Sequence, residues 1–435
     1  MQIGVVPFLN PCFGGLYQYS LAMLEALTTI SRRNQEGDTY TVFIRPEDEA
    51  MVRNLDSTGI RIAVYGSRLD RLRASLKAWV GQGVLRQAFH KLQQRLTRRR
   101  VRNLDPSPKE TTLGTWLRLH KIDWVLYTTP DSTSFESDLP YVMPVFDLQH
   151  RLQPEFPEVS ADGEWDEREY LYRNGTHQAT LILADSDVGK EDILGCYGPY
   201  GITPDRVKVL PYVPAPYLAR AVPQQERMRV RNAYHLPKRF FFYPAQLWPH
   251  KNHMRIVQAV GRLKEAGTEI NLVLCGANSG AIRTRVFHEI MGEVDRLGIS
   301  RQIYYIGYVP NDVMSALYAE AAGLVMPTFF GPTNIPIAEA WLFGCPVLTS
   351  DIRGIREQVG DAGLLVDPRS VESIAESMRR LWEDDALRAD LAQRGSERLS
   401  LHKQEDFCEK LGEIIAETNQ RVAKCKSAIG KTAFL

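Results

Sequence analysis

The chain has 435 residues, a length that predicts two or three domains and excludes a single small module. Its net charge of +1 and apolar fraction of 44% favour packed globular domains and give no reason to expect a nucleic-acid partner. The six cysteines form no C-x-x-C pair, and no apolar stretch approaches the roughly 18 residues of a membrane-spanning helix, so we expect reduced thiols and a cytoplasmic location.

Apolar runs rich in Val, Ile, Leu and Phe alternate with helical patterns, which is typical of βαβ units around parallel sheets. In the first half, strands are predicted at 2–8, 39–44, 124–127, 142–146 and 181–184, with a helix over 16–31. In the second half, strands are predicted at 240–244, 271–275, 303–307, 324–327 and 347–349, each followed by a helical stretch. The expected fold class is therefore α/β, with two Rossmann-like domains.

Between the predicted strands of the first half lies a strongly basic insertion at about 68–104. Residues 68–102 contain eleven Lys and Arg and one acid, a net charge of +10, so the rest of the chain carries −9. Leu and aromatic residues recur there at helical spacing, which predicts basic amphipathic helices. One interpretation is contact with an anionic membrane surface; the alternative is that the apolar stripe packs on the first domain and the charges are solvated. Trp79 and Phe89 are too few aromatics to favour a single-stranded nucleic-acid surface.

Prolines between 211 and 216 mark the expected domain boundary. The sequence predicts a first domain at 1–213, a linker without regular structure at 214–236 and a second domain at 237–403. An amphipathic helix is expected at 404–420, followed by a frayed tail at 421–435.

The first candidate site is the loop 10–15, which follows the first predicted strand and opens a helix. Gly14 and Gly15 would allow a ligand to approach the backbone, and a helix N-terminus attracts anions. The alternative is an ordinary tight turn. Because the loop lacks a complete G-x-G-x-x-G pattern, a NAD site is disfavoured.

The second candidate is Lys251, which follows the first strand of the second domain and is expected to open the next helix. Ligands of doubly wound sheets bind at the carboxyl ends of strands, so this cation is placed to meet a phosphate. The alternative is a solvated lysine at a helix start.

The third candidate lies in 329–347, where Asn334 is expected to cap a helix and Pro336 to occupy its first turn. Glu339 then lies early in an otherwise apolar helix. A carboxylate there can accept hydrogen bonds from the two hydroxyls of a ribose, and it needs a partner to be tolerated. The alternative is a glutamate that interacts with the helix dipole.

These motifs together resemble those of retaining GT-B glycosyltransferases of glycosyltransferase family four. The resemblance covers nearly the whole chain and rests on the following segments: Gly14-Gly15, Asp147-Leu-Gln-His150 with Pro154-Glu155, Ala184-Asp-Ser186, the Lys251 motif, Ile306-Gly-Tyr-Val309, Ile335-Pro-Ile-Ala-Glu339, Gly344-Cys-Pro-Val347 and Gly363-Leu-Leu-Val-Asp367. It implies a GT-B fold whose two parallel sheets face a central cleft. It also implies an acceptor domain first, a donor domain second, and a last helix that crosses back to the first domain.

The resemblance also implies which residues form the site. Donor-binding residues would be Gly14, Gly15, Gln246, Lys251, Gly307, Tyr308, Val309, Pro332, Thr333, Asn334, Ile335 and Glu339. Catalytic residues would be Asp147, His150 and Lys251. The backbone around Gly307 to Val309 would recognise the base. A polar pair, Asp147 and His150, would orient the acceptor hydroxyl; the alternative is that His150 only ties down its own loop.

Three positions depart from the family pattern. Gln246 replaces the arginine that usually precedes the motif lysine by five positions, and Gly331 replaces the first of two glutamates. Phe146 stands where many relatives have a histidine, so His150 is a substitute for it. Loss of a cation and an anion together suggests a subgroup that holds the diphosphate with Lys251 and the amides of 331–334. The alternative is a non-catalytic GT-B-fold binding or regulatory subunit.

The resemblance implies transfer of a hexosyl group, with retained anomeric configuration, from a nucleotide diphosphate sugar. The acceptor would be a sugar or a lipid-linked oligosaccharide in bacterial surface polysaccharide or glycoconjugate synthesis, and the basic insertion would bring the enzyme to the inner face of the membrane. No cofactor or metal is expected, because Lys251 and helix-terminal amides can stabilise the leaving diphosphate. The stretch 185–187 matches the D-x-D pattern of metal-dependent transferases, but Asp and Ser are ordinary turn formers at strand ends.

Overall fold

The computed structural model of the chain describes residues 1–11, 14–33, 37–52, 59–66, 111–214, 218, 221–401 and 403–432. Two units are distinguished. Unit 1 comprises Met1–Pro154, Val159–Pro211 and Gln404–Leu435, and unit 2 comprises Glu155–Glu158 and Tyr212–Lys403. The basic insertion predicted at about 68–104 lies outside the described residues.

Unit 1 is built on a seven-stranded parallel sheet in the order β3-β2-β1-β4-β5-β6-β7. Its strands are β1 (Gln2–Val6), β2 (Thr39–Ile44), β3 (Arg61–Val64), β4 (Trp124–Tyr127), β5 (Tyr141–Val145), β6 (Leu181–Ala184) and β7 (Val207–Val209). Every residue of β4, β5 and β6 is buried. This explains their continuous apolar sequence, because a parallel strand covered on both faces has no solvent-facing positions.

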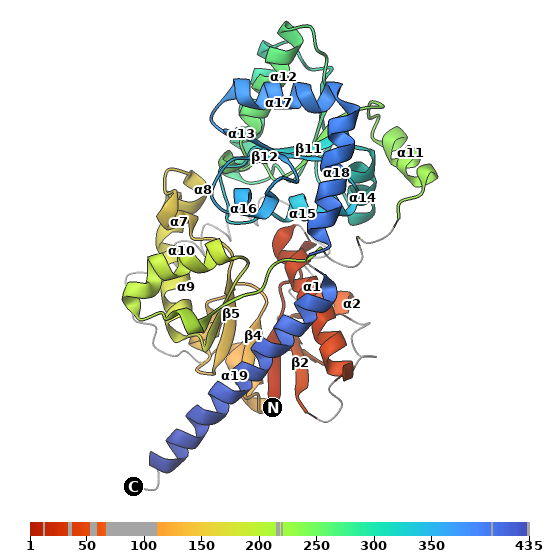
Figure 1. Cartoon of the computed structure of the whole chain (residues 1–435). Helices are drawn as coiled ribbons and strands as arrows, with labels where there is room; N and C mark the ends of the chain where they lie inside the picture. The colour runs from red at the N-terminus through yellow and green to blue at the C-terminus, as the bar shows by residue number, and fades with distance from the viewer. Residues whose placement is uncertain are drawn as a thin grey trace. The chain divides into compact units, whose positions relative to one another are not determined.

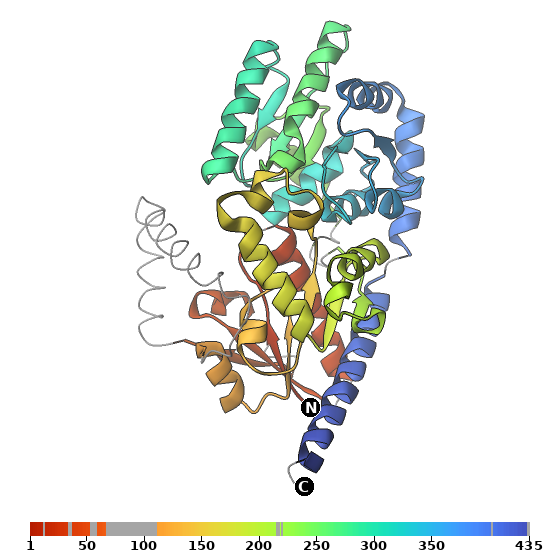
Figure 2. The ribbon, with the colours of Figure 1, turned by 90° about the vertical axis from the view of Figure 1, so that its left-hand side faces the viewer.

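The helices of unit 1 pack around its sheet. They are α1 (Gly15–Arg33), α2 (Glu49–Val52), α5 (Thr112–Leu119), α6 (Thr133–Glu136), α7 (Gln149–Leu152), α9 (Glu164–Gln178), α10 (Asp187–Tyr197) and α19 (Gln404–Thr432), and the short α8 (Pro157–Ser160) begins in unit 2. Helix α9 packs on β5 and lies across the sheet in Figure 2, where it is yellow. Helix α19 packs against α1, and Asn419 on it accepts a hydrogen bond from the Trp124 indole at 2.8 Å.

Unit 2 contains a six-stranded parallel sheet in the order β10-β9-β8-β11-β12-β13. Its strands are β8 (Phe241–Pro244), β9 (Leu272–Cys275), β10 (Ile303–Tyr305), β11 (Gly323–Met326), β12 (Val347–Ser350) and β13 (Leu364–Val366). In the register of the sheet, Phe241 of β8 lies between Leu272 of β9 and Gly323 of β11. Strand β8 is therefore the central strand from which the chain builds outward in both directions.

The helices of unit 2 lie on both faces of this sheet. They are α11 (Gln224–Ala233), α12 (His253–Glu265), α13 (Ala281–Arg296), α14 (Asn311–Glu320), α15 (Ile335–Leu342), α16 (Ile355–Val359), α17 (Val371–Glu383) and α18 (Asp385–Leu399). Helix α12 packs against α13 and α17, and α15 packs against α18. In Figure 1, α12, α13 and α17 lie on one side of strands β11 and β12. Helices α14, α15 and α16 lie on the other side. A three-layer arrangement results.

In each sheet the strand order reverses once. The reversal lies between β1 and β4 in unit 1 and between β8 and β11 in unit 2. In open α/β sheets the carboxyl ends of the strands at such a reversal form the usual ligand site, because the connections leave in opposite directions there. The loops that follow β8 and β11 are consequently the places to look for a site in unit 2.

The structure corrects the predicted organisation at two places. The linker predicted at 214–236 contains α11, which packs against α14 and whose Arg227 and Arg231 pair with Glu320. The tail predicted from 421 is instead helical through Thr432. Ion pairs hold this extension to unit 1, since Lys426 binds Asp123. The sequence did not indicate these two helices, because they are stabilised by ion pairs with residues far away along the chain.

Candidate functional site

The loop after β8 holds Lys251 in a fixed backbone position. Residues Pro249–Lys251 form a single 3₁₀ turn, and the Lys251 amide donates to the Trp248 carbonyl at 3.0 Å. The hydroxyl of Tyr243 donates to the Lys251 carbonyl at 2.8 Å. Helix α12 begins only at His253, after Asn252 in the left-handed region at φ 60°. Lys251 thus precedes the helix that it was expected to open.

Asn252 ties this loop to two others. Its side-chain amide donates to the Pro327 carbonyl at 2.8 Å and to the Pro368 carbonyl at 2.7 Å, and the residue is only 3% exposed. These buried bonds join the loops that follow β8, β11 and β13. The backbone that carries Lys251 is therefore rigid.

A contact between Lys251 and Asn334 brings the second and third candidate motifs together. The ammonium Nζ of Lys251 donates to Asn334 Oδ1 at 3.3 Å. Asn334 occupies the predicted N-cap position of α15, but its side chain does not cap the helix and instead donates through Nδ2 to the Phe330 carbonyl at 2.9 Å. Its backbone amide donates to Gln358 Oε1 at 2.8 Å. That amide, one of those expected to bind a diphosphate, is already paired.

Close packing explains the glycine at the departing position 331. A Cβ atom at Gly331 would lie 3.1 Å from the Arg353 carbonyl oxygen. One at Gly354, which has φ +89°, would lie 2.3 Å from the Pro332 carbonyl oxygen. The loop 331–334 thus packs closely against the backbone of 353–354, and a side chain at 331 would require a small shift of the Arg353 carbonyl.

Glu339 is the buried carboxylate of the site. The residue is 6% exposed, and its Oε2 accepts a hydrogen bond from the Tyr318 hydroxyl at 2.8 Å. Burial raises the pKa of Glu339 to about 7, although the Tyr318 hydrogen bond acts in the opposite direction. No cation pairs with Glu339 within the described part of the chain. The carboxylate therefore lacks the charged partner that would make it structural.

Other predicted donor residues occupy different loops. Gly307 has φ +69°, and its carbonyl accepts a hydrogen bond from the Gly276 amide at 2.8 Å. Tyr308 is 52% exposed, whereas Val309 is buried. Gly14, with φ +47°, belongs to unit 1 and turns the chain into α1, which begins at Gly15.

In unit 1, Asp147 and His150, the expected polar pair, contact different residues. Asp147 follows β5, accepts a hydrogen bond from the Gln149 amide at 3.1 Å and forms an ion pair with Arg168. His150 is 0% exposed, and its ring stacks on Tyr172 at 5.6 Å. The placement of His150 agrees with the alternative in which it holds its own loop. Its role in catalysis stays a prediction.

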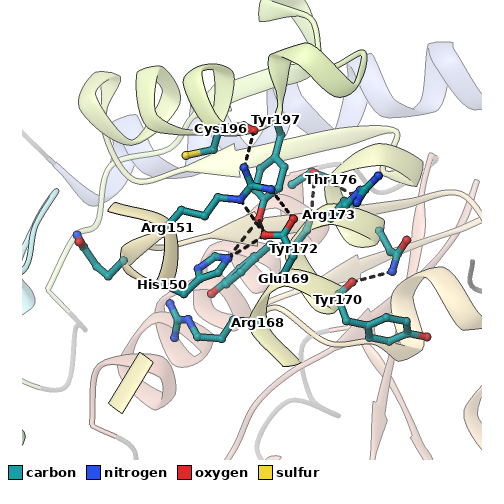
Figure 3. A network of polar contacts seen from close by, with 12 residues as sticks. His150, Arg151, Arg168, Glu169, Tyr170, Tyr172, Arg173, Thr176, Cys196 and Tyr197 are labelled. Atoms are coloured by element: carbon teal, nitrogen blue, oxygen red, sulfur yellow. Dashed lines mark hydrogen bonds and ion pairs between the residues drawn. The ribbon is translucent and has the colours of Figure 1, made fainter. Parts of the chain in front are cut away.

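His150 belongs to a network centred on Glu169 (Figure 3). Its Nε2 lies 3.3 Å from Glu169 Oε2, which also accepts from Arg151 Nε at 2.8 Å and from the Tyr197 hydroxyl at 3.1 Å. Burial alone would raise the pKa of Glu169, but the Arg151 and His150 hydrogen bonds outweigh it and lower the pKa to about 2. Glu169 is therefore a structural anion that joins α7, α9 and α10.

The D-x-D stretch at 185–187 forms a helix cap. Ser186 occupies the N-cap of α10, and its hydroxyl accepts from the Gly189 amide at 3.0 Å. Among the residues that the structure describes, no group of three His, Cys, Asp or Glu is arranged to hold a metal ion. Within the same residues, no helix is long and apolar enough to cross a membrane.

Several residues of the site escaped sequence reasoning. Tyr318 and Gln358 contact Glu339 and Asn334 from α14 and α16, across sequence separations of 21 and 24. Neither lies in a motif. For Gly354 the sequence gives only a weak indication, because a glycine just before a helix is consistent with a close approach of two backbone segments.

Comparison with known proteins shows that unit 2 is similar to a glycosyltransferase family. The sequence model of the family Glycosyl transferases group 1 matches residues 224–398. The matched residues lie within unit 2. The O-antigen chain mannosyltransferase B of Escherichia coli is 30% identical over 220 residues, which are 50% of this chain and 55% of the relative. The chain thus spans about half the length of that relative.

Other matches extend over most of the chain. The D-inositol 3-phosphate glycosyltransferase of Corynebacterium glutamicum is 24% identical over 398 residues, covering 88% of this chain and 87% of the relative. The crystal structure of Anabaena Alr3699/HepE in complex with UDP and glucose has a TM-score of 0.66 and 17% identity, covering 96% of this chain and all of that one. The fold is GT-B, as the sequence predicted.

Proposed function

We propose that the protein is a retaining hexosyltransferase that uses a nucleotide diphosphate sugar as donor. The acceptor is a sugar or a lipid-linked oligosaccharide of a bacterial surface polysaccharide or glycoconjugate. The names of the relatives support this class of reaction, since they include an O-antigen mannosyltransferase and an inositol phosphate glycosyltransferase. A nucleotide sugar donor agrees with the UDP and glucose in the HepE structure.

The observation that carries the proposal is the state of Glu339. A buried carboxyl with a pKa of about 7 and no cationic partner among the described residues is unfavourable for folding, so a binding role accounts for it better than a structural one. Tyr318 uses one oxygen of the carboxylate, which leaves the other to accept hydrogen bonds from ribose hydroxyls.

Lys251 supplies a positive charge for the diphosphate. Its Nζ contacts Asn334 Oδ1 at 3.3 Å, so the ammonium lies beside the N-terminus of α15, where the helix dipole also favours an anion. In this proposal the lysine stabilises the charge that develops on the leaving diphosphate. No metal is required for that step, so turnover is expected to persist in EDTA.

The test couples binding to turnover. A ligand that binds only the folded state raises the melting temperature, so a thermal-shift screen against UDP-, GDP-, ADP- and dTDP-hexoses identifies the donor. The selected donor is then mixed with candidate acceptors, and release of free nucleoside diphosphate and the anomeric configuration of the product are measured. An inverted product would contradict the retaining reaction, and strict dependence on a divalent metal would contradict the role of Lys251.

A second candidate is a binding or regulatory subunit without turnover, which the departures Gln246 and Gly331 favour. Donor binding without nucleoside diphosphate release in the presence of any acceptor would support it. For either candidate we propose a cytoplasmic location, where the donor would be available.

A further inference from the structure

The guanidinium of Arg283 is placed unusually for a charged group in unit 2. Arg283 lies in the first turn of α13, and its NH1 donates to Gln246 Oε1 at 2.6 Å. Its Cζ lies 4.7 Å from the centre of the Trp248 ring. The residue is half-buried, and its Nε is buried without a hydrogen-bond partner.

Within the described ranges, no carboxylate neutralises this charge. Arg283 forms no ion pair with any residue that the structure describes, whereas its neighbour Arg285 pairs with Glu289 at 3.6 Å on the exposed side of the same helix. Burial lowers the pKa of Arg283, and Tyr305 acts in the opposite direction. A cation that is partly removed from water without a counter-charge is costly unless an anion binds to it.

The loop after β8 connects Arg283 to Lys251. Gln246 Oε1 also accepts from the Trp248 indole at 3.0 Å, and the Trp248 carbonyl accepts from the Lys251 amide at 3.0 Å. This loop packs tightly on the loop after β9, because a Cβ atom at Gly276 would lie 2.2 Å from the Ala245 carbonyl oxygen. Both cations are thus fixed to one short segment at the carboxyl ends of β8 and β9.

We propose that Arg283 is a second diphosphate-binding cation and that it supplies, from α13, the positive charge that position 246 lacks. The inference rests on the proposed function and adds a residue to the same site. A planar guanidinium can donate two parallel hydrogen bonds to a phosphate. Gln246 fits this arrangement, since its amide oxygen accepts from the guanidinium, whereas a second cation at 246 would repel it.

The test measures, by calorimetry, affinity for four nucleotide pairs: UDP and UMP, GDP and GMP, ADP and AMP, and dTDP and dTMP. Arg283→Gln is expected to weaken binding of the preferred nucleoside diphosphate about tenfold or more and to change monophosphate binding less, because a charge-assisted hydrogen bond to the outer phosphate is lost. Arg283→Lys should recover part of the affinity. Arg285→Gln is the matched control and should bind like the wild type.

An exchange variant separates ligand binding from loop support. Gln246→Arg combined with Arg283→Gln returns a cation to the pair of touching side chains, so it should bind the diphosphate more tightly than Arg283→Gln alone. Equal loss for diphosphate and monophosphate together with a lower melting temperature would overturn the inference in favour of a structural clamp. Wild-type affinity in Arg283→Gln while Lys251→Ala is weakened would overturn it and leave the proposed function intact. A wild-type protein that binds none of the nucleotides would overturn both.

Discussion

Replacing Glu339 by Gln should stabilise unit 2 and weaken nucleotide binding, two effects of opposite sign. The pKa of Glu339 is about 7 in the folded protein, against an ordinary value of 4.5. Between these values the unfolded chain has lost a proton that the folded chain retains, so stability falls as pH rises through this window. At 1.36 kcal/mol for each pKa unit, the total loss by pH 8 is about 3 kcal/mol.

Glu339→Gln removes this loss, because the amide is neutral at every pH and its oxygen can still accept from Tyr318. The variant and the wild type should melt at nearly the same temperature near pH 4.5. At pH 8 the melting temperature of unit 2 should be higher in the variant by several degrees, since 1 kcal/mol corresponds to roughly 2–4 °C for a domain of this size.

The binding assay is calorimetry with the nucleotide sugar selected by the thermal-shift screen, because the phosphates of such a diphosphate diester do not titrate near neutral pH. Affinity of the wild type should rise as pH increases through about 7, because the ribose hydroxyls donate to the ionised carboxylate. Glu339→Gln should bind about tenfold more weakly at pH 8 and show a flat pH profile. A variant that is less stable than the wild type at pH 8, or that binds equally well, would refute the reasoning.

Three further predictions concern the rest of the chain. Glu169→Gln should destabilise unit 1 by roughly 3 kcal/mol at neutral pH, because the pKa of Glu169 is lowered to about 2. The stabilisation that the Glu169 carboxylate provides is present above pH 4.5 and is lost as pH falls toward 2. An unchanged denaturation midpoint would contradict this. His150→Ala should lower the melting temperature by removing the ring stacked on Tyr172, whereas a fall in kcat at unchanged melting temperature would return His150 to the acceptor site. If the basic insertion binds membranes, the protein should co-sediment with anionic but not neutral vesicles at low salt, and replacing Arg98, Arg99 and Arg100 by Gln should abolish this; equal absence from both vesicle types would leave the insertion structural.

The central strands were predictable because a strand that is buried on both faces is apolar at nearly every position. Strands β2, β4 and β6 have the bounds that their apolar runs indicated. The edge strands β3 and β7 were missed, since their residues are partly exposed and include Arg61 and Lys208, which interrupt the apolar pattern. Edge position, which the sequence does not state, decides whether such a run forms a strand.

The same distinction applies to the site. The sequence singled out Lys251 because it follows a buried strand, and Glu339 because it interrupts an apolar helix. Tyr318, which contacts Glu339, and Arg283, which contacts Gln246, could not be found this way, because both lie on helices that sequence spacing does not place. The sequence located Lys251 and Glu339, but only the tertiary structure reveals that no cation of the described residues pairs with Glu339.

The central claim is that Glu339 and Lys251 hold the ribose and the diphosphate of a nucleotide sugar. A crystal structure of the protein with the donor selected by thermal shift tests it most directly. The ribose hydroxyls should lie within hydrogen-bond distance, about 2.7–3.2 Å, of the Glu339 carboxylate, and phosphate oxygens should contact Lys251 Nζ. A nucleotide bound elsewhere, with Glu339 still contacting only Tyr318, would contradict it.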